Sequence, residues 1–392
     1  KPRGAKIFID GKPQTTWFSS IFNKKNFMST PAKIKNLLPG EYNLRLELGG
    51  YWNWQKKLTV NSGASTFAEN IYLFKNDLPA QIAPAATKSI HLSPDKNQAV
   101  ILSAELITFF NLSNEAEKSV KRNDITGKNI LWSQSQTKII IDNYLYDLAD
   151  LSSVIDLKKL TANSFNYKWI GGALYYQDKN SIYRLEASGL PKKIINYKIF
   201  NDYLIKNNYI HLIIKSGAAA NLEVIDAVTG QNLKTINLPT ALNYSFINAE
   251  QNLLNLYDHS HKILYLIDPL AVYQPLVEII NNVKTAFWIN SSNLLYTNDF
   301  EIWLYNLETK NKILLTRIAD TINQAILHPS KDYIIYSTEQ TINAIELDER
   351  EKRNITELIK FDSINSFILT NEILYFSGKI GNAEGLYKFF IQ

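Results

Sequence analysis

The sequence predicts an all-β protein with two domains, a small antiparallel β-sandwich followed by a large β-propeller. Short apolar segments recur about 35 to 43 residues apart between residues 99 and 376, which is the period of propeller blades. Ahead of them, residues 1–75 alternate apolar and polar side chains between Gly turns, a pattern typical of half-buried strands. The length of 392 residues suits one small and one large domain, which we place at residues 1–75 and 76–392.

Composition indicates a globular chain and excludes several kinds of site. Apolar residues make up 45% of the chain, with 22 Tyr, 18 Phe and 7 Trp, which is enough for a packed core. The net charge is only +5 and basic residues are mixed with acidic ones, so we expect no nucleic-acid partner. Because cysteine is absent, disulfides, thiolate metal sites and a cysteine nucleophile are excluded. No run of about 18 apolar residues occurs.

The first 75 residues contain short strands that end at Gly turns. Ile7 and Ile9 indicate a short alternating strand that ends in the Gly turn Asp10-Gly11-Lys12. The alternating residues from Tyr42 to Leu48 lead in the same way into Gly49-Gly50. Since alternate side chains of a strand share one face, each of these strands has one face available for a core.

This region resembles the PEGA domain in the order and spacing of its turns and strands. The residues that carry the resemblance are Pro2-Arg3-Gly4-Ala5, Asp10-Gly11-Lys12, Thr30-Pro31, Leu37-Leu38-Pro39-Gly40-Glu41-Tyr42 and Gly50-Tyr51. The chain departs from the family at Arg3, where the family name implies Glu, and in a long segment from Pro13 to Ser29. The resemblance implies a surface or envelope module, often anchored near its N-terminus, without catalytic residues of its own.

The second region consists of eight repeating units, each with a pair of apolar strands. The first strands are expected at Ala99–Leu102, Lys138–Ile141, Ala173–Tyr176, Ile210–Ile214, Leu253–Tyr257, Leu294–Tyr296, Tyr333–Tyr336 and Ile373–Phe376. The second strands are expected at Ile107–Leu112, Leu145–Leu148, Ile182–Leu185, Leu222–Asp226, Ile263–Asp268, Ile302–Leu307, Ile342–Leu347 and Leu386–Ile391. Further strands such as Leu233–Leu238 give four strands per unit, as in a propeller blade. Eight blades are predicted, and seven with one irregular unit is the alternative.

Two turns in this region resemble the turn of WD40-like and TolB-like propellers, at Leu92-Ser93-Pro94-Asp95-Lys96 and at His328-Pro329-Ser330-Lys331-Asp332. The last unit ends at Gln392 without a fourth strand. The segment Leu78–Ala83 is the spare β-capable segment beside the first blade, so we expect it to add as the outer strand of the final blade.

Few residue patterns point to chemistry. Two histidines, His259 and His261, share a strand face beside Asp258. They are candidate propeller-face residues, and a metal site there is weighed against a solvated loop, which is the favoured interpretation. Three tryptophans, Trp132, Trp169 and Trp288, occupy similar places in their units. They could line a pocket at the propeller mouth, but packing between blades is the favoured interpretation. No nucleophile elbow, P-loop, dinucleotide-binding or calcium-loop motif occurs. We therefore expect no catalytic residues, no cofactor and no metal.

The long segment between Pro13 and Ser29 carries six large apolar side chains, more than so small a domain can bury. Its aromatic residues are candidate partner-binding residues, namely Trp17, Phe18, Phe22 and Phe27. The propeller of the same chain is one partner they suit, and an external protein or the bilayer is the other.

These observations favour a non-enzymatic binding or scaffold protein of the cell envelope, displayed outside the cytoplasm as a monomer. The expected partner is a protein or a cell-envelope glycan bound by a propeller face. An apolar segment upstream of Lys1 is expected to anchor the chain in the cytoplasmic membrane. The alternatives are an enzyme that acts in the central propeller cavity, for example on a glycan, and an intracellular propeller scaffold.

Overall fold

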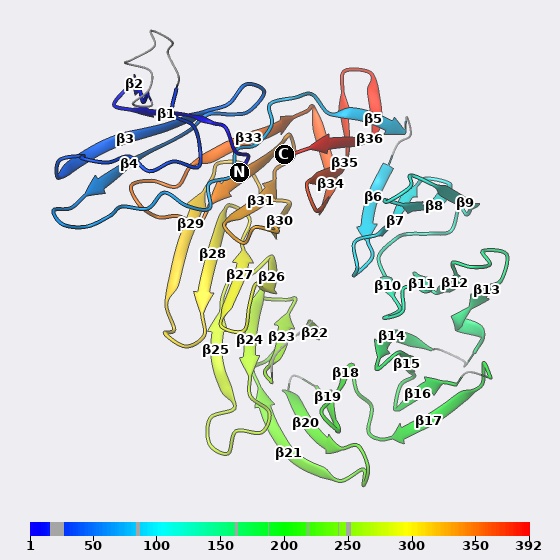
Figure 1. Ribbon diagram of the computed structural model, residues 1–392. Coiled ribbons are helices and arrows are strands. Elements are labelled where there is room, and N and C mark those ends of the chain that lie inside the picture. The colour runs from blue at the N-terminus through cyan, green and yellow to red at the C-terminus, as the bar shows by residue number, and fades with distance from the viewer. Residues whose placement is uncertain are drawn as a thin grey trace. The chain divides into compact units, whose positions relative to one another are not determined.

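The computed structural model describes residues 1–15, 27–83, 87–160, 164–186, 188–217, 219–241, 243–247 and 252–392 (Figure 1). Strands make up almost all of the regular structure in these residues, beside one short 3-10 helix, η1 (Leu157–Lys159). None of the described helices is long and apolar enough to cross a membrane. Contacts divide the chain into two compact units, one of residues 1–90, 299–302 and 314–392 and the other of residues 91–298 and 303–313. The domain boundary after residue 75 stays a prediction.

The N-terminal region forms an antiparallel four-stranded sheet in the order β2-β1-β3-β4. Its strands are β1 (Lys6–Ile9), β2 (Lys12–Pro13), β3 (Gly40–Glu47) and β4 (Trp54–Val60). The turn between β1 and β2 has positive φ at Asp10 (47°) and Gly11 (76°), as a two-residue hairpin turn requires. One face of the sheet packs against the segments around Met28 and Leu73, which form the rest of the small core.

Eight more four-stranded sheets follow along the described chain. Four of them are β6 (Thr87–Leu92), β7 (Gln98–Ser103), β8 (Leu106–Asn111) and β9 (Glu117–Lys121); β10 (Ile130–Trp132), β11 (Lys138–Ile141), β12 (Tyr144–Asp147) and β13 (Val154–Asp156); β14 (Phe165–Ile170), β15 (Ala173–Gln177), β16 (Ser181–Leu185) and β17 (Pro191–Asn196); and β18 (Asp202–Lys206), β19 (Tyr209–Ser216), β20 (Ala219–Asp226) and β21 (Asn232–Leu238).

The other four are β22 (Tyr244–Ile247), β23 (Leu254–Asp258), β24 (Ile263–Ile267) and β25 (Leu276–Ile280); β26 (Thr285–Trp288), β27 (Asn293–Thr297), β28 (Glu301–Asn306) and β29 (Lys312–Arg317); β30 (Gln324–Leu327), β31 (Tyr333–Ser337), β32 (Thr341–Glu346) and β33 (Ile355–Lys360); and β34 (Ser363–Thr370), β35 (Ile373–Ile380), β36 (Ala383–Phe390) and β5 (Ala80–Ala83). Repeated four-stranded antiparallel sheets of this kind are the blades of a β-propeller. The number of blades stays a prediction.

The expected strand pairs are confirmed in all eight sheets, where they are the second and third strands. These central strands have a neighbouring strand on each side and apolar packing on both faces, so they are apolar almost throughout. All five residues of β31 are buried, for example. Each sheet also has a first strand. The apolar pattern indicates that of the last sheet at Ile364–Leu369, which is β34, but it does not reveal first strands of mixed composition such as β14.

Side chains that bond to their own turn fix the connections between strands. The Asp226 carboxylate accepts the backbone N–H groups of Val228 and Thr229, and Asn306 does the same for Glu308 and Thr309. Such Asx turns end a strand and reverse the chain within a few residues. In these two sheets the turn holds the third and fourth strands in the same arrangement.

The final sheet is completed by a strand from far upstream, as expected. Strand β5 pairs antiparallel with β36, with Ala83 opposite Leu386 and Ala80 opposite Lys388. Figure 1 shows β5 alongside β36 at the C-terminal end of the chain. The pairing covers the edge of β36 and ties the start of the propeller region to its end.

Candidate functional site

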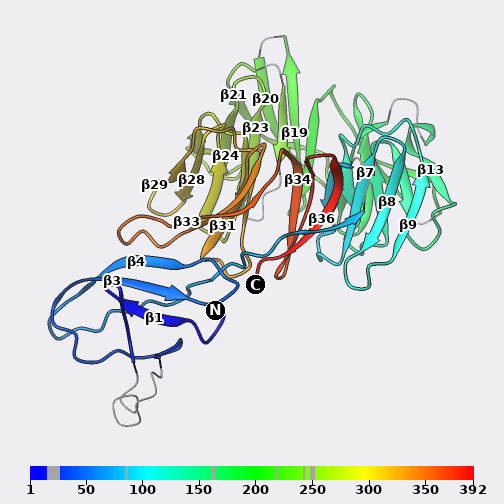
Figure 2. The same ribbon diagram turned by 90° about the horizontal axis from the view of Figure 1, so that it is seen from above.

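The N-terminal sheet binds the end of the β30–β33 sheet through polar contacts. In Figure 2, β4 lies beside β31 and β33. The Asn354 side chain donates to the Gln55 carbonyl (3.0 Å), and Glu351 accepts the Lys57 N–H (2.7 Å). These residues belong to β4 and to the connection between β32 and β33. All of them lie in the same compact unit.

A buried ion pair lies at the centre of this contact. The Lys56 ammonium donates to Glu346 Oε1 at 2.5 Å and to the Asp348 carbonyl at 2.9 Å. Glu346 Oε2 accepts the Trp54 indole N–H at 2.9 Å, so both carboxylate oxygens are bonded. The side chains of Lys56 and Glu346 are 0% and 3% exposed. A charge pair this deeply buried is stable only when both partners are present.

The alternation of β4 explains why a lysine occupies this position. Trp54, Lys56 and Leu58 are buried, while the residues between them are exposed. Lys56 therefore lies on the core face of the strand, where an unpaired charge would be costly. Glu346, the last residue of β32, supplies the required partner from the propeller side.

Aromatic side chains continue the contact beside the ion pair. Tyr72 and Phe74 pack against Tyr333, with ring centroids 6.2 and 5.3 Å away, and against His328, at 4.5 and 6.0 Å. The Tyr72 backbone N–H donates to the Tyr333 hydroxyl at 3.1 Å. Tyr72 and Phe74 thus belong to the core of the last propeller sheets.

His328 is held neutral in this aromatic environment. Burial lowers its pKa from 6.5 to about 4. The backbone N–H of Ser330 donates to Nδ1 at 3.1 Å, so the ring accepts at Nδ1 and carries its proton on Nε2. The Nε2 atom has no hydrogen-bond partner among the described residues.

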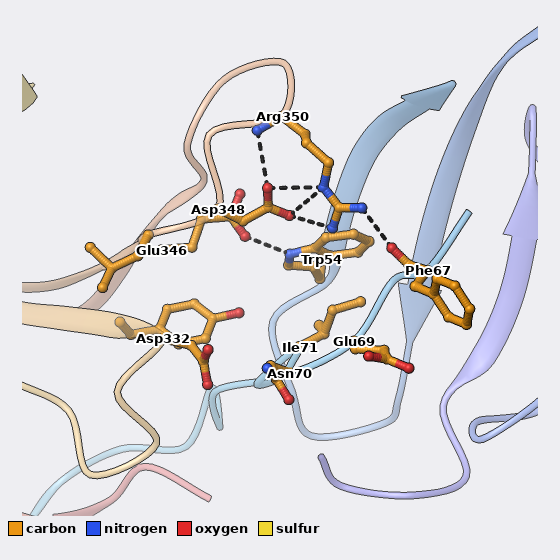
Figure 3. Close-up of a pocket in the computed structure, with 11 residues that line it drawn as sticks. Trp54, Phe67, Glu69, Asn70, Ile71, Asp332, Glu346, Asp348 and Arg350 are labelled. Atoms are coloured by element: carbon orange, nitrogen blue, oxygen red, sulfur yellow. Dashed lines mark hydrogen bonds and ion pairs between the residues drawn. The ribbon is translucent and has the colours of Figure 1, made fainter. Parts of the chain in front are cut away.

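A cavity of about 290 Å³ lies beside the ion pair, and we call it the junction pocket (Figure 3). Its lining residues are Trp54, Phe67, Glu69, Asn70, Ile71, Asp332, Tyr333, Glu346, Leu347, Asp348 and Arg350. In Figure 3, Arg350 and Asp348 lie on one side of Trp54, and Glu69, Asn70 and Asp332 lie on the other.

The charged groups of the pocket fall into two kinds. Asp348 is compensated: burial alone would raise its pKa, but hydrogen bonds from Arg350 and the charges of Lys56 and Arg350 lower it to about 2. Asp332 has no such compensating cation, and burial raises its pKa above the ordinary value in spite of hydrogen bonds from Asn70 and Ser330. The titratable side chains in the described lining of the pocket are carboxylates, Tyr333 and Arg350.

A second buried charge pair lies on the first strands of the middle sheets. Asp202 accepts the Lys168 ammonium at 2.7 Å and the backbone N–H of Phe246 at 2.7 Å, which joins β14, β18 and the strand β22. Burial lowers the pKa of Lys168, while Asp202 opposes the shift. The ammonium also lies 4.9 Å from the centre of the Tyr203 ring. This network links three successive sheets.

Three of the candidate partner-binding residues, Trp17, Phe18 and Phe22, lie outside the described residues. Phe27 is described, forms a bridge with Thr15, and is 37% exposed. The Lys6 ammonium lies 5.0 Å from the centre of its ring. Phe27 thus lies at the edge of the small domain, and its role as a partner-binding residue stays a prediction.

The three tryptophans proposed for a propeller face are on first strands and pack into cores. Trp132, Trp169 and Trp288 belong to three separate apolar clusters. Trp169 also donates its indole N–H to the Leu131 carbonyl at 3.3 Å. All three thus take part in apolar clusters, and their role at a propeller face or in packing between blades stays a prediction.

The two histidines lie on the turn between β23 and β24 and have different partners. His261 Nδ1 contacts the buried Asp258 carboxylate at 2.7 Å, and His259 Nε2 contacts Ser245 Oγ at 2.7 Å. Both histidines are exposed. In the described part of the chain, no group of three or more His, Cys, Asp or Glu side chains could hold a metal ion.

The sequence interpretation missed the residues of the junction pocket and its ion pair. Lys56 carried a signal, because it stands between Trp54 and Leu58 on the apolar face of an alternating strand. Glu346 and Asp348 carried none, because an acidic residue at the end of a strand is normally a turn residue.

Comparisons with known proteins agree with this architecture. The family description "PEGA domain" matches residues 19–71. No curated protein matches the chain. Among solved structures, the Dos1 propeller is similar at 12% identity with a TM-score of 0.56, over 81% of this chain and 95% of its own.

Two further structures share the fold with low sequence identity. A eukaryotic initiation factor has 10% identity and a TM-score of 0.52, over 75% of this chain and 82% of its own. Dihydro-heme d1 dehydrogenase NirN in complex with DHE has 15% identity and a TM-score of 0.51, over 70% of this chain and 67% of its own. Such identities show the fold alone. The chain therefore carries a PEGA domain near its N-terminus, matched at residues 19–71, and a β-propeller after it.

Proposed function

We propose that this chain is a non-catalytic, extracytoplasmic scaffold protein of the cell envelope that binds a protein partner through its propeller. A PEGA domain joined to a propeller supports a binding or scaffold role. The extracytoplasmic location and an anchor upstream of Lys1 are parts of the proposal that rest on the envelope role the PEGA resemblance implies.

Exposed apolar side chains on the connections of two successive sheets carry the proposal. Val228, between β20 and β21, is 87% exposed, and Val272 and Tyr273, between β24 and β25, are 81% and 93% exposed. The Lys234 ammonium on β21 donates to the Ala271 carbonyl, which ties β21 to the connection between β24 and β25. We call Val228, Val272 and Tyr273 the apolar rim.

Exposed apolar side chains that gather on a connected surface are typical of interaction sites. Connections between strands carry binding residues in many folds, because the sheets beneath them form a rigid support. Aromatic and aliphatic side chains gain binding energy when a partner protein buries them. A protein partner therefore suits the apolar rim better than a glycan does.

Photo-crosslinking in the native organism tests this function. A photoreactive phenylalanine analogue replaces Tyr273 in the full-length protein, and a second variant carries it at the exposed Lys118 as the control. We expect one discrete protein adduct from position 273 and none from position 118, and we expect Val272→Ser to reduce the adduct. Adducts of equal yield at both positions, or none at either, would contradict the proposal. A glycan adduct at position 273 would identify the partner as a glycan and refute the protein partner.

The location is tested separately with a reporter enzyme that is active only outside the cytoplasm. Fused to the C-terminus of the full-length gene product, the reporter is expected to be active and to sediment with membranes. Activity that depends on adding a foreign leader peptide would refute the extracytoplasmic location without affecting the binding proposal.

A further inference from the structure

Two carboxylates in the junction pocket have no cationic partner among the described residues. Glu346 and Asp348 are compensated by Lys56 and Arg350 through ion pairs of 2.5 and 2.6 Å. Glu69 and Asp332 line the same cavity and take part in no ion pair there. Asp332 is half-buried and bonded to the neutral Asn70. The pocket therefore has negative charge that the chain does not neutralise.

The remaining walls of the pocket suit a flat or elongated cation. Trp54 and Tyr333 contribute aromatic rings, and Ile71 and Leu347 contribute apolar surface. Aromatic faces attract ammonium and guanidinium groups, and apolar walls accept the methylene groups of a long side chain. A cavity of about 290 Å³ has room for a basic side chain, whereas a bare metal ion would leave most of it empty.

We propose that the junction pocket binds a guanidinium or ammonium group carried by a basic side chain of the partner polypeptide. This inference rests on the proposed function and identifies a second contact for the same partner. The cation would lie between Glu69 and Asp332, with its aliphatic part against Trp54. Phe67 at the rim is exposed and offers apolar surface to the neighbouring residues of the partner.

An anionic group does not suit the pocket. Both cations that contact it are already engaged: Lys56 is buried against Glu346, and Arg350 bonds to Asp348 and to the Phe67 carbonyl. An anion would therefore face Glu69 and Asp332 without a free countercharge. Removing either engaged cation would also leave a carboxylate of the contact unpaired.

The test uses fluorine NMR of the full chain labelled with 5-fluorotryptophan, in which seven Trp residues give resolvable signals. The Trp54 signal is assigned with Trp54→Phe. Three probes of matched chain length are titrated: n-butylguanidinium, n-butanol and butyrate. The blocked tripeptide acetyl-Gly-Arg-Gly-amide is titrated separately, so that a free cation and a basic side chain of a polypeptide are distinguished.

We expect n-butylguanidinium and the tripeptide to shift the Trp54 signal in a saturable way, and n-butanol and butyrate to leave it unchanged. Asp332→Asn and Glu69→Gln should each weaken cation binding about tenfold, as expected for one charged hydrogen bond. Glu357→Gln removes an exposed carboxylate on β33 outside the pocket and should leave binding unchanged. Melting temperatures of all variants are measured alongside, to establish that they are folded.

The proposal is overturned if neither cation shifts the Trp54 signal, if n-butanol shifts it as strongly, or if Asp332→Asn binds the cations as tightly as the unmodified protein. Binding of n-butylguanidinium without binding of the tripeptide would refute the polypeptide source. These outcomes are independent of crosslinking at the apolar rim. Failure of the pocket and failure of the proposed function are therefore distinguishable.

Discussion

Replacing Lys56 with methionine removes the countercharge at the centre of the contact between the N-terminal sheet and the propeller. Methionine has nearly the length of lysine and keeps the apolar stem in place. Glu346 then retains the bonds from the Trp54 indole and the Asn354 N–H, both 2.9 Å long, but loses its ion-pair partner Lys56. The carboxylate stays buried with its charge uncompensated.

Breaking one half of a buried ion pair costs about 3–5 kcal/mol. A compact unit of this size loses about 2–4 °C of melting temperature per kcal/mol, so the expected decrease is about 6–20 °C. The double variant Lys56→Met with Glu346→Leu removes both charges and should recover most of the loss, since an apolar pair of similar volume is often as stable as the ion pair.

Scanning calorimetry measures these changes, with Lys57→Met as the matched control. Lys57 is the next residue along β4, its side chain is 53% exposed, and its ion pair with Glu41 lies at the surface. Removing such a pair costs about 0.2–1 kcal/mol. If Lys56→Met lowers the melting temperature no more than Lys57→Met does, the buried pair does not hold the two parts together and this reasoning is refuted.

Three further changes have defined outcomes. Burial lowers the pKa of His328 to about 4 in the folded chain. The neutral ring therefore makes its full contribution to the free energy of unfolding above pH 6.5, its ordinary pKa, and this contribution is lost as the pH falls toward 4. In urea unfolding, His328→Gln should remove up to about 3 kcal/mol of this pH dependence. Replacing Ala80–Ala83 with Gly-Ser-Gly-Ser should destabilise the final sheet by about 2–4 kcal/mol, because the strand that covers β36 loses its preference for the extended conformation. Faster amide hydrogen exchange in β36 is the expected measurement. Gly378→Ala should destabilise by about 1–3 kcal/mol in the same urea assay, because its Cβ would lie 2.8 Å from the Ser363 carbonyl oxygen, whereas an unchanged midpoint would show that β34 moves aside freely.

Much of the propeller could be predicted because its central strands are buried on both faces. Segments such as Tyr333–Tyr336 are apolar throughout, and their spacing repeats with each sheet. The closing strand followed from a count of four strands per sheet, since the last sheet lacked one. First strands such as β14 were not predicted, because residues like Asn166 and Lys168 serve a polar network that leaves no periodic apolar signal.

The junction pocket could not be predicted, because it is formed by residues far apart in the sequence. Glu346 lies 290 positions from Lys56, and the contact exists only once β4 meets the end of β32. The position of Lys56 on an apolar strand face was the one local sign of a buried partner. Which acidic residue would pair with it depends on the packing of two sheets, which a single sequence does not specify.

The most direct test of the account is whether the N-terminal sheet is fixed to the propeller sheet beside it. The chain has no cysteine, so Thr59→Cys on β4 and Glu357→Cys on β33, both exposed, can be spin-labelled without background. Electron–electron double resonance should give one narrow distance distribution, and adding Lys56→Met should broaden it. A broad distribution that is the same with and without Lys56→Met would contradict the account.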